Sequence, residues 1–575
     1  MQFLPTISVK ASRYLPSRWD LLAALIVLTF IVAFASASRL LMQPLSSLQT
    51  HHISLSPSHL PGYALRTALR MLIAMGLSLL FTFTYATLAA KRPRAGALLV
   101  PLLDILQSVP ILGFISITVV FFLSLAPGRI FGAELAAVFA IFTSQAWNMA
   151  FSFYQSLRTV PEELEEAGRM FRLNAWARFW RIEVPFAMPQ LVWNMMMSMS
   201  GGWFFVVAAE AITVGHTTLV LPGIGSYIAT AIAQRSLPAI FWAIGAMLIV
   251  ILIYDQLLFR PLVAWADRFR FDEQQSEEQP DSWALTMFRR SRLIAVIAEP
   301  FSGMMRRTFR SSPDAASRWM LPRPHVPERT ADVIWNAVLI AIAIFSLWWI
   351  GRFAQHGVSL KDIRRAFESG LITMVRVLVL IALASAVWVP VGVYVGLRPR
   401  LAGIVQPVAQ FLAAFPANLL FPLAVSAIVI WDLNPDIWLS PLMVLGTQWY
   451  ILFNVIAGAS TLPMELRDAA TNFNVRGWLW WRNVALPGVF PFYITGAITA
   501  SGGSWNASIV AEVASWGGRT LHAHGLGAYI ADATAAGNFH RIVLGIAVMS
   551  FLVTLINRLF WRRLYVYAER RFRVA

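Results

Sequence analysis

The sequence contains no cysteine in 575 residues, which excludes disulfides, thiolate metal ligands and cysteine nucleophiles. Charged residues are scarce at 13%, about half of the roughly 25% usual in soluble globular proteins, whereas 58% of the residues are hydrophobic. Histidines occur as His51-His52 and His522-x-His524, without a third ligand at metal spacing, so no metal site is expected. No Gly-x-x-x-x-Gly-Lys-Ser/Thr motif is present, and the chain therefore has no phosphate-binding loop of its own. We expect an integral membrane protein with no cofactor and no catalytic residues.

Apolar stretches near the length needed to cross a bilayer recur along the chain. In the first half they cover residues 21–38, 64–90, 98–125, 135–153, 191–213 and 240–259. In the second half they cover residues 333–350, 371–396, 404–431, 438–457, 490–513 and 542–560. The sequence predicts an all-α polytopic membrane protein of about twelve transmembrane helices.

The positions of the cations predict the orientation. The net charge of +17 would suggest nucleic acid for a soluble protein, but arginine and lysine accumulate in the cytoplasmic loops of membrane proteins, beside anionic lipid. The clusters before the first predicted helix, after the second, and between the fourth and fifth fall on one side, and both termini should be cytoplasmic. Lys361, Arg364 and Arg365 in an outer loop are an exception, partly offset by Asp362 and Glu368. We expect the bacterial inner membrane and lipid contact, and no nucleic acid.

The two halves are copies of each other. A shift of 306 places Thr67 on Thr373 and Arg70 on Arg376 (376 − 70 = 306), and after the fourth predicted helix a shift of 302 places Glu210 on Glu512 (512 − 210 = 302). This predicts two tandem six-helix repeats in parallel topology, which pack about a pseudo-two-fold axis along the membrane normal with a pathway between them. The expected domains are residues 1–263, a cytoplasmic linker 264–331, and residues 332–575.

Two segments outside the core of the repeats have alternative interpretations. The start of the chain, with Ala35-Ser36-Ala37, resembles a signal peptide with a cleavage site. The equivalent stretch at 333–350 cannot be a signal peptide, and this symmetry favours retention of the first helix. In the linker, the basic and apolar run 287–310 is compatible with an interfacial helix or with a loosely ordered tether.

The loop between the fourth and fifth predicted helices carries the most informative motif. Pro161 and Pro185 are 24 residues apart (185 − 161 = 24), as are Pro463 and Pro487 in the second copy (487 − 463 = 24). A proline followed by carboxylates predicts the start of a short helix, since both suit a helix N-terminus. Its apolar stripe has small residues in the middle, which favours close docking on another surface. The residues expected to contact a partner are Glu163, Leu164, Glu166, Ala167, Gly168 and Phe171 in the first copy, and Glu465, Leu466, Asp468, Ala469, Ala470 and Phe473 in the second.

These loops resemble the cytoplasmic loop of permease subunits of binding-protein-dependent ABC importers. In that family a Glu-Ala-Ala motif forms a coupling helix seated in a cleft of the ATPase subunit; here the motif reads Glu166-Ala167-Gly168 and Asp468-Ala469-Ala470. The family usually has glycine four residues after the second alanine, where this chain has Arg172 and Asn474. The resemblance implies two ABC ATPase subunits and an extracytoplasmic solute-binding protein as partners.

A narrower resemblance lies in the fifth predicted helices. Ser200-Gly201-Gly202-Trp203 and Ser501-Gly502-Gly503-Ser504-Trp505, each followed by an Ala-Glu pair and a Gly-x-Gly, are similar to the nitrate, sulfonate, taurine and bicarbonate group of permeases. This implies transport of a small oxyanion such as nitrate, sulfonate or bicarbonate. An amino acid or another small polar solute is the alternative substrate.

Ionisable residues within membrane helices are candidate functional residues. We expect Arg70 to pair with Glu210 and Arg376 with Glu512, either as structural ion pairs or as groups lining the substrate path. Pathway or gate candidates are Ser200, Trp203, Glu210, Ser501, Trp505 and Glu512; the serine–glycine segments also suit close helix packing. Pro110 and Pro416 predict kinks in the third helix of each half.

The sequence therefore favours both permease halves of an ABC importer in one polypeptide, with ATP hydrolysis on a separate subunit. Two functions from other classes remain open. An ion-coupled secondary transporter would need buried acids for the coupling ion, and only Glu210 and Glu512 are candidates. A membrane-embedded enzyme would need a convergent set of histidine, aspartate or serine side chains, and the sequence shows none.

Overall fold

The computed structural model describes residues 53–108, 111–214, 217–269, 283–291, 357–516 and 519–572, with isolated residues at 21–28, 299 and 337–352. These residues form two packing units, which are treated separately below. The first comprises Met1–Val32, Ser152–Trp193 and Asp255–Leu360, and the second Ala33–Phe151, Asn194–Tyr254 and Lys361–Ala575. The predicted helices at 21–38 and 333–350 fall largely outside the described residues, as do His51, His52 and Pro110.

The described residues are almost entirely helical. The long helices of the first copy are α3 (Leu60–Lys91), α4 (Pro93–Ser108), α5 (Ile111–Leu125), α6 (Ile130–Arg158), α9 (Val184–Ala209) and α11 (Leu237–Tyr254). Those of the second copy are α17 (Leu360–Gly396), α18 (Pro399–Ala414), α19 (Phe421–Ile430), α22 (Gln448–Ser460), α25 (Leu486–Ala511) and α27 (Phe539–Ile556). Within the described part, seven helices are long and apolar enough to cross a membrane, and up to nine if each bent pair counts as one span. The chain is an all-α polytopic membrane protein.

The duplication is visible in the element boundaries. Each fifth helix is entered through a π-helical turn, Phe179–Glu183 and Trp481–Ala485 (481 − 179 = 302), and each sixth helix ends in one, Asp255–Phe259 and Asn557–Trp561 (557 − 255 = 302). The short strands β1 (Ala211–Val214) and β2 (Thr217–Val220) form an antiparallel hairpin, and β3 (Val513–Trp516) and β4 (Arg519–His522) form its counterpart. A ten-residue helix follows each hairpin, α10 (Ile224–Ala233) and α26 (Leu526–Ala535).

The hairpins correct the predicted ends of the fifth helices. The apolar runs continue to Thr213 and Val513, but the helices stop at Ala209 and Ala511, and those last residues lie in β1 and β3. The β-branched sequence Ile212-Thr213-Val214 suits an extended strand better than a helix. Hydropathy alone does not separate the two.

In the second copy, helix breaks interrupt the third and fourth predicted spans. The kink predicted at Pro416 is confirmed: α18 and the helical segment from Ala417 to Ile430 are bent by 68°. The fourth span differs between the copies. In the first copy α6 is one helix of 29 residues, whereas the second copy is divided into α20 (Pro435–Trp438), α21 (Leu442–Leu445) and α22, with a 44° bend. Pro435 and Pro441 occupy the positions of Ala133 and Phe139 in α6 (435 − 133 = 302), and proline interrupts a helix.

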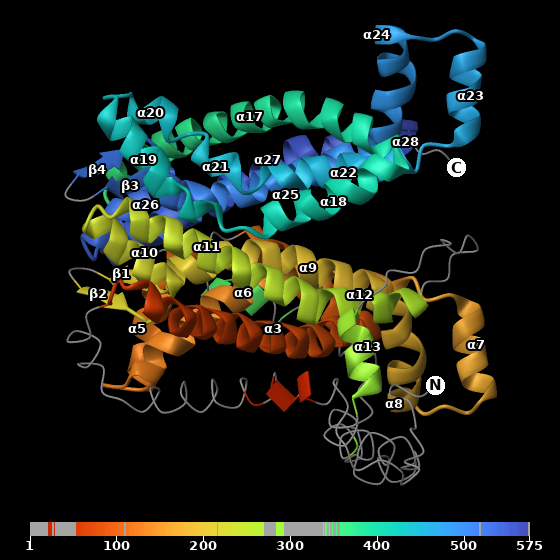
Figure 1. Cartoon of the computed structure of the whole chain (residues 1–575), viewed down its shortest axis with the longest axis horizontal. Helices are drawn as coiled ribbons and strands as arrows, with labels where there is room; N and C mark the ends of the chain where they lie inside the picture. The colour runs from red at the N-terminus through yellow and green to blue at the C-terminus, as the bar shows by residue number, and fades with distance from the viewer. Residues whose placement is uncertain are drawn as a thin grey trace. The chain divides into compact units, whose positions relative to one another are not determined.

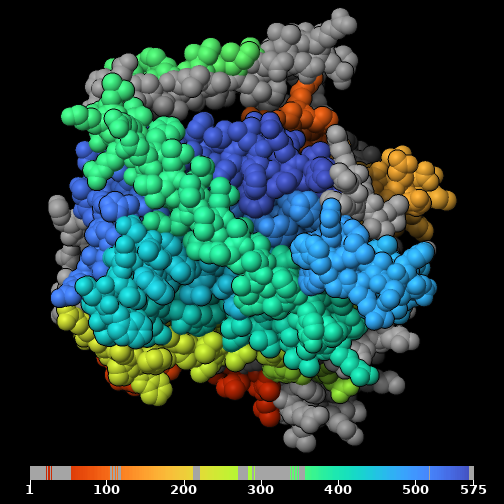
Figure 2. Space-filling view, turned by 90° about the horizontal axis from the view of Figure 1, so that it is seen from above, coloured from red at the N-terminus to blue at the C-terminus, as the bar shows by residue number. Residues whose placement is uncertain are grey.

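In the second packing unit, α17, α22, α25 and α27 run alongside one another (Figure 1). The β3–β4 hairpin lies at one end of these helices, and the short helices α23 (Met464–Asn472) and α24 (Gly477–Trp480) project at the other (Figure 1). Figure 2 shows α17, in green, crossing the face between the cyan segment of α20–α22 and the blue C-terminal helices. Large apolar side chains of α17 are exposed, including Val375, Val379 and Leu383, as expected for a lipid-facing helix.

The first packing unit contains the other projecting loop and the start of the linker. The loop consists of α7 (Glu162–Met170) and α8 (Ala175–Arg178). Of the linker, the described residues are 264–269, 283–291 and 299, and they include α13 (Trp283–Arg290). This helix packs on α12 (Arg260–Ala266), with Ala284 and Met287 buried and Trp283 Nε1 donating to Gln256 Oε1 at 3.2 Å. The rest of the run 292–310, apart from Glu299, lies outside the described residues.

Candidate functional site

At the hairpin end of the first repeat, a network is built around the guanidinium of Arg70 on α3. Its Nε and Nη2 donate to the two oxygens of Glu134 on α6 at 2.6 Å, and its Nη1 donates to Oε1 of Glu210 at 2.7 Å. Glu210 directly follows α9 and is fully buried. Its Oε1 also accepts from Thr67 Oγ1 at 2.6 Å, and its Oε2 accepts from the backbone N–H of Gly225 at 2.7 Å. Both oxygens of the buried carboxylate therefore have donors, as a buried charge requires.

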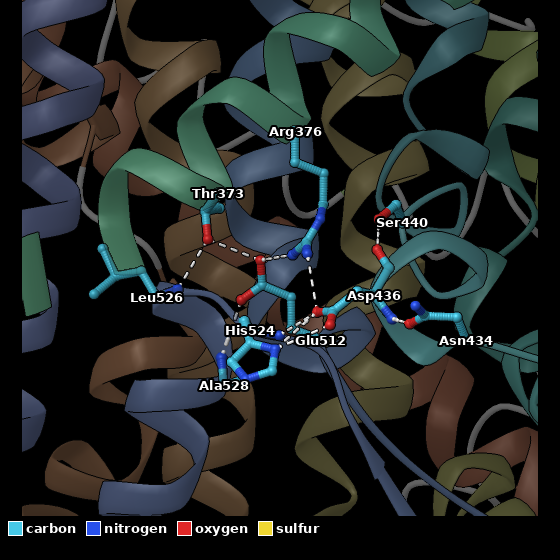
Figure 3. Close-up of polar contacts among 9 residues, drawn as sticks. All are labelled: Thr373, Arg376, Asn434, Asp436, Ser440, Glu512, His524, Leu526 and Ala528. Atoms are coloured by element: carbon cyan, nitrogen blue, oxygen red, sulfur yellow. Dashed lines mark hydrogen bonds and ion pairs between the residues drawn. The ribbon is translucent and has the colours of Figure 1, made fainter. Parts of the chain in front are cut away.

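The second repeat contains the equivalent network, which Figure 3 shows. Arg376 Nη1 on α17 donates to Oε1 of the buried Glu512 at 2.8 Å, and Thr373 Oγ1 donates to the same oxygen at 2.8 Å. The other oxygen, Oε2, accepts from the backbone N–H of Ala528 at 3.1 Å. Thr373 Oγ1 in turn accepts from the backbone N–H of Leu526 at 2.8 Å. The structure thus brings together the two arginine–glutamate pairs expected from the sequence. Below, these two clusters are called the hairpin-end networks.

The glycines after each hairpin leave room for these carboxylates. A Cβ atom at Gly223 would overlap the Glu210 carboxylate, and one at Gly525 would overlap that of Glu512. The carboxylates accept backbone N–H groups in the first turn of α10 and α26, where a helix favours negative charge. The Gly-x-Gly motif after each hairpin therefore serves to seat the glutamate.

The two networks differ at their second carboxylate. Glu134 holds Arg70 with two bonds of 2.6 Å, whereas Asp436 lies 3.5 Å from Arg376 Nη2 and is 38% exposed. Asp436 is held instead by His524, whose backbone N–H donates to Oδ1 at 2.6 Å and whose Nδ1 lies 2.9 Å from Oδ2 (Figure 3). Because aspartate is shorter than glutamate and Asp436 is bound by His524, the contact between Asp436 and Arg376 is longer than that between Glu134 and Arg70.

Glu134 and Asp436 were not predicted as site residues. A signal for them exists, because the shift of 302 already places Glu134 on Asp436 (436 − 134 = 302). The shift changes from 306 to 302 between Arg70 and Glu134, and this obscures the match. Only the folded structure shows that both acids reach the arginine from another helix.

The two projecting loops have the same backbone geometry. α7 and α23 each have nine residues, and each is preceded by a proline, Pro161 and Pro463, with ψ of 142° and 139°. Both end in a Schellman motif: the N–H of Leu173 donates to Gly168 O at 3.0 Å, and the N–H of Val475 donates to Ala470 O at 2.8 Å. The loops are thus two copies of one backbone motif.

The motif places Arg172 and Asn474 in the left-handed region, with φ of 49° and 53°. Glycine is the usual residue there because a side chain costs about 1 kcal/mol in this conformation, although asparagine is better tolerated than arginine. The chain therefore forms this turn without its usual glycine.

Each of these helices has a buried face and an exposed face. Gly168 is buried, and a Cβ there would lie 2.8 Å from Cδ1 of Ile182, so this small residue closes α7 onto the chain's own next segment. Ala470 is the buried residue of α23. Large apolar side chains are exposed at both C-termini: Phe171 is 78% and Phe473 81% exposed. Of the other predicted contact residues, Glu163, Glu166, Glu465, Leu466 and Asp468 are exposed, whereas Leu164, Ala167 and Ala469 are partly buried.

The pathway candidates occupy different environments. Ser200 reaches the other repeat, because its hydroxyl donates to the carbonyl of Ala413. Trp203 is buried and packs edge-on against Tyr254 of its own repeat, with ring centroids 5.1 Å apart. Ser501 and Trp505 are buried as well. Glu210 and Glu512 belong to the hairpin-end networks. Ser200 is therefore a candidate that hydrogen-bonds across the boundary between the repeats.

Comparison with curated proteins finds relatives among anion permeases. The chain is 26% identical to the bicarbonate transport system permease protein CmpB of Synechococcus elongatus over 33% of its own length and 66% of the relative. It is 24% identical to the nitrate import permease protein NrtB of Leptolyngbya laminosa, over 32% and 62%, and 27% identical to the taurine transport system permease protein TauC of Escherichia coli, over 33% and 67%. The match thus spans a little less than two thirds of the first two relatives.

A protein-family model matches the chain twice. The model is described as the binding-protein-dependent transport system inner membrane component, and it matches residues 74–260 and 388–574, well over half of the chain. The two matches coincide with the two repeats and include both projecting loops. The chain belongs to this family of ABC importer permeases of the inner membrane, and it carries the family's domain twice.

Proposed function

We propose that this chain forms the complete transmembrane pathway of an ATP-driven importer, with both permease halves in one polypeptide. The halves are residues 1–263 and 332–575, joined by a cytoplasmic linker at 264–331. Two separate ATPase subunits dock on α7 and α23, and an extracytoplasmic binding protein delivers the solute at the hairpin end. Both termini face the cytoplasm.

The observation that carries this proposal is the pair of projecting loops. Each ends in a phenylalanine that is about four-fifths exposed, Phe171 at 78% and Phe473 at 81%, next to exposed carboxylates. Exposed aromatic side chains on a rigid, projecting helix are typical of interface anchors. Two copies of one docking helix suit two copies of a motor subunit.

The substrate we propose is a small oxyanion such as nitrate, sulfonate or bicarbonate. The curated relatives are named for bicarbonate, nitrate and taurine transport, and taurine is itself a sulfonate. The proposal that this chain carries the same class of solute is based on its 24–27% identity to these relatives.

The hairpin-end networks favour ATP-driven over ion-coupled transport. A coupling ion would supply the positive charge that a buried carboxylate needs, but here Arg70 and Arg376 supply it, and both oxygens of each carboxylate accept protein donors. Among the described residues, no group of three or more metal-binding side chains is present. We therefore assign these glutamates a structural role, fastening the second helix of each repeat to the hairpin region.

Charge reversal on the docking helices tests the proposal. The full chain is purified with its ATPase, and Glu166→Lys and Asp468→Lys are combined in one variant. We expect loss of the ATPase from the purified complex with no change in the thermal stability of the membrane protein. Asp532→Lys, a reversal at a 57% exposed residue at the hairpin end, is the matched control and should retain the ATPase. Retention by the double variant would refute the docking assignment.

A further inference from the structure

Polar side chains link the two repeats at several points within the second packing unit. The Ser200 hydroxyl donates to Ala413 O, and Asn418 Nδ2 donates to Phe204 O at 3.1 Å. In the other direction, Asn506 Oδ1 accepts from the backbone N–H of Ile111 at 2.8 Å. Each contact joins residues more than 200 positions apart, one from each repeat. We call these three contacts the polar seam.

The polar seam follows the helix breaks. Ala413 and Asn418 flank the 68° bend at Pro416, and Ile111 is the first residue of α5, at the corresponding position in the first repeat. A helix break leaves backbone N–H and C=O groups without intrahelical partners. Side chains of the opposite repeat bind these groups. The repeats are thus held together where their third helices are interrupted.

The contacts of Asn418 and Asn506 are related by the duplication, but with exchanged roles. Asn506 corresponds to Phe204 (506 − 204 = 302), and Asn418 corresponds to Leu112, the neighbour of Ile111 (418 − 112 = 306). In the contact with Ile111, α25 supplies the side chain of Asn506. In the contact with Asn418, α9 supplies the backbone carbonyl of Phe204. Both copies therefore place a polar link at the same level, although the residues differ.

The groups around the seam are uncharged and rich in hydrogen-bond donors. Gln410 Nε2 lies 3.5 Å from Sδ of Met196 across the same boundary, and the Tyr450 hydroxyl lies close to Gly201. None of these contacts involves an ionisable carboxylate or a cation. The carboxylates of Glu210 and Glu512, which also belong to the second packing unit, are bound in the hairpin-end networks.

We propose that these donors form the site through which a small oxyanion crosses between the repeats, an inference that rests on the proposed importer function. When the repeats separate, three donors lose their partners together: the Ser200 hydroxyl, the Asn418 amide nitrogen and the Ile111 N–H, which Asn506 Oδ1 releases. An oxyanion accepts hydrogen bonds from all three donors. Neutral donors bind an anion weakly enough for it to leave, which conduction requires, and no carboxylate repels it.

Opening the polar seam costs less free energy than opening an apolar interface of the same size. Separation of apolar helix faces exposes hydrocarbon to water, whereas separation of the seam exposes groups that water and the anion can satisfy. The seam can therefore close firmly in one state and open in another without a large loss of hydrogen bonding.

The absence of cysteine makes a direct test possible, because each introduced cysteine is the only thiol in the chain. Ser200→Cys, Asn418→Cys and Asn506→Cys are prepared in the whole transporter in proteoliposomes. Each is treated with the anionic thiol reagent methanethiosulfonate ethylsulfonate, without nucleotide and with ATP plus vanadate. Ser78→Cys is the control, because Ser78 is a fully buried serine that bonds within its own repeat, to Phe142 O and Gln145.

We expect the three seam cysteines to react at least tenfold faster than Ser78→Cys in one nucleotide state, and nitrate, bicarbonate or taurine to slow the reaction. Seam cysteines as slow as the control in both states would show a sealed packing surface and overturn the proposal. Fast reaction that none of the three solutes slows would overturn the assignment of an oxyanion site. Reaction that is slowed by an anion but is independent of ATP and of the ATPase would refute the importer function and leave the seam site standing.

A second measurement uses variants that preserve shape. Asn418→Asp and Asn506→Asp add one negative charge each, and we expect kcat/KM for anion uptake to fall by more than about tenfold, because like charges repel at close range. Asn418→Ser and Asn506→Ser introduce a neutral hydroxyl in place of a charge and should lose less. Equal losses of kcat/KM in the aspartate and the serine variants, or no loss in the aspartate variants, would contradict a role in anion passage.

Discussion

Arg376 Nη1 lies 2.8 Å from Glu512 Oε1, and at the matched position of the other repeat Arg70 Nη1 lies 2.7 Å from Glu210 Oε1. Each pair ties the second helix of a repeat to the residue that follows its fifth helix. Glu210 is 0% and Glu512 1% exposed, so the loss of the arginine leaves a buried, uncompensated carboxylate.

Removal of a buried arginine should therefore be costly. We expect Arg70→Ala and Arg376→Ala each to lower the free energy of unfolding by about 3–5 kcal/mol. Thermal denaturation in detergent, followed by size-exclusion chromatography, measures the effect. Arg364→Ala, which breaks an exposed pair with Glu368, is the control and should cost far less, because water screens exposed ion pairs. Equal shifts in all three variants would contradict the assigned structural role.

The two networks should respond unequally to loss of their second acid. Glu134→Gln removes a carboxylate that makes two charge-assisted bonds, and we expect a cost of about 2 kcal/mol. Asp436→Asn changes a partly exposed group 3.5 Å from its arginine, and we expect less than about 1 kcal/mol. Denaturation curves of the two variants, recorded side by side, compare these costs. A larger loss for Asp436→Asn would mean that its contacts with His524 dominate.

The turn after α7 contains removable strain. Arg172→Gly relieves a left-handed arginine at φ 49°, and we expect the loop to gain about 0.5–1 kcal/mol of local stability. Asn474→Gly should gain less, since asparagine tolerates this conformation. Hydrogen exchange at the amides of Leu173 and Val475 reports the local stability. Faster exchange in Arg172→Gly would show that the arginine side chain contributes more than its backbone strain costs.

The exposed phenylalanines should matter for the partner and not for the fold. We expect Phe171→Ala and Phe473→Ala each to weaken ATPase binding about tenfold, the usual effect of removing an aromatic anchor. Their melting temperatures should not change, because both side chains are about four-fifths exposed. Phe241→Ala, at a 59% exposed residue of α11, is the control for loss of exposed aromatic area and should bind normally. Normal binding by both loop variants would contradict the docking surface.

The two docking helices should differ in their dependence on salt. α7 carries four glutamates and one arginine, whereas α23 carries one glutamate, one aspartate and one arginine. Screening weakens interactions between exposed charges. With the α23 contact weakened by Phe473→Ala, we expect ATPase binding to fall steeply between about 0.05 and 0.5 M salt. With the α7 contact weakened by Phe171→Ala, the decrease should be smaller. The same slope for both variants would show that charge on α7 does not contribute.

Much of the architecture was accessible from the sequence because duplication supplies an internal comparison. The repeat, the projecting loops and the pairing of Arg70 with Glu210 all follow from matched positions. Other features depend on contacts that hydropathy does not encode. The apolar run through Ile212 reads as helix, yet Ile212 lies in a strand that directly follows the glutamate bound by Arg70. The side chains of Asn418 and Asn506 give no sequence signal, because they bind backbone groups of the opposite repeat.

Uptake by the reconstituted assembly tests the central claim most directly. The chain, its ATPase and its binding protein are placed in proteoliposomes, and accumulation of labelled nitrate, bicarbonate or taurine is measured with and without ATP on the side of α23. We predict ATP-dependent accumulation of at least one anion by the native chain, and none by the variant that combines Glu166→Lys with Asp468→Lys. Accumulation by the chain alone, driven by an ion gradient in the absence of any ATPase, would contradict the account.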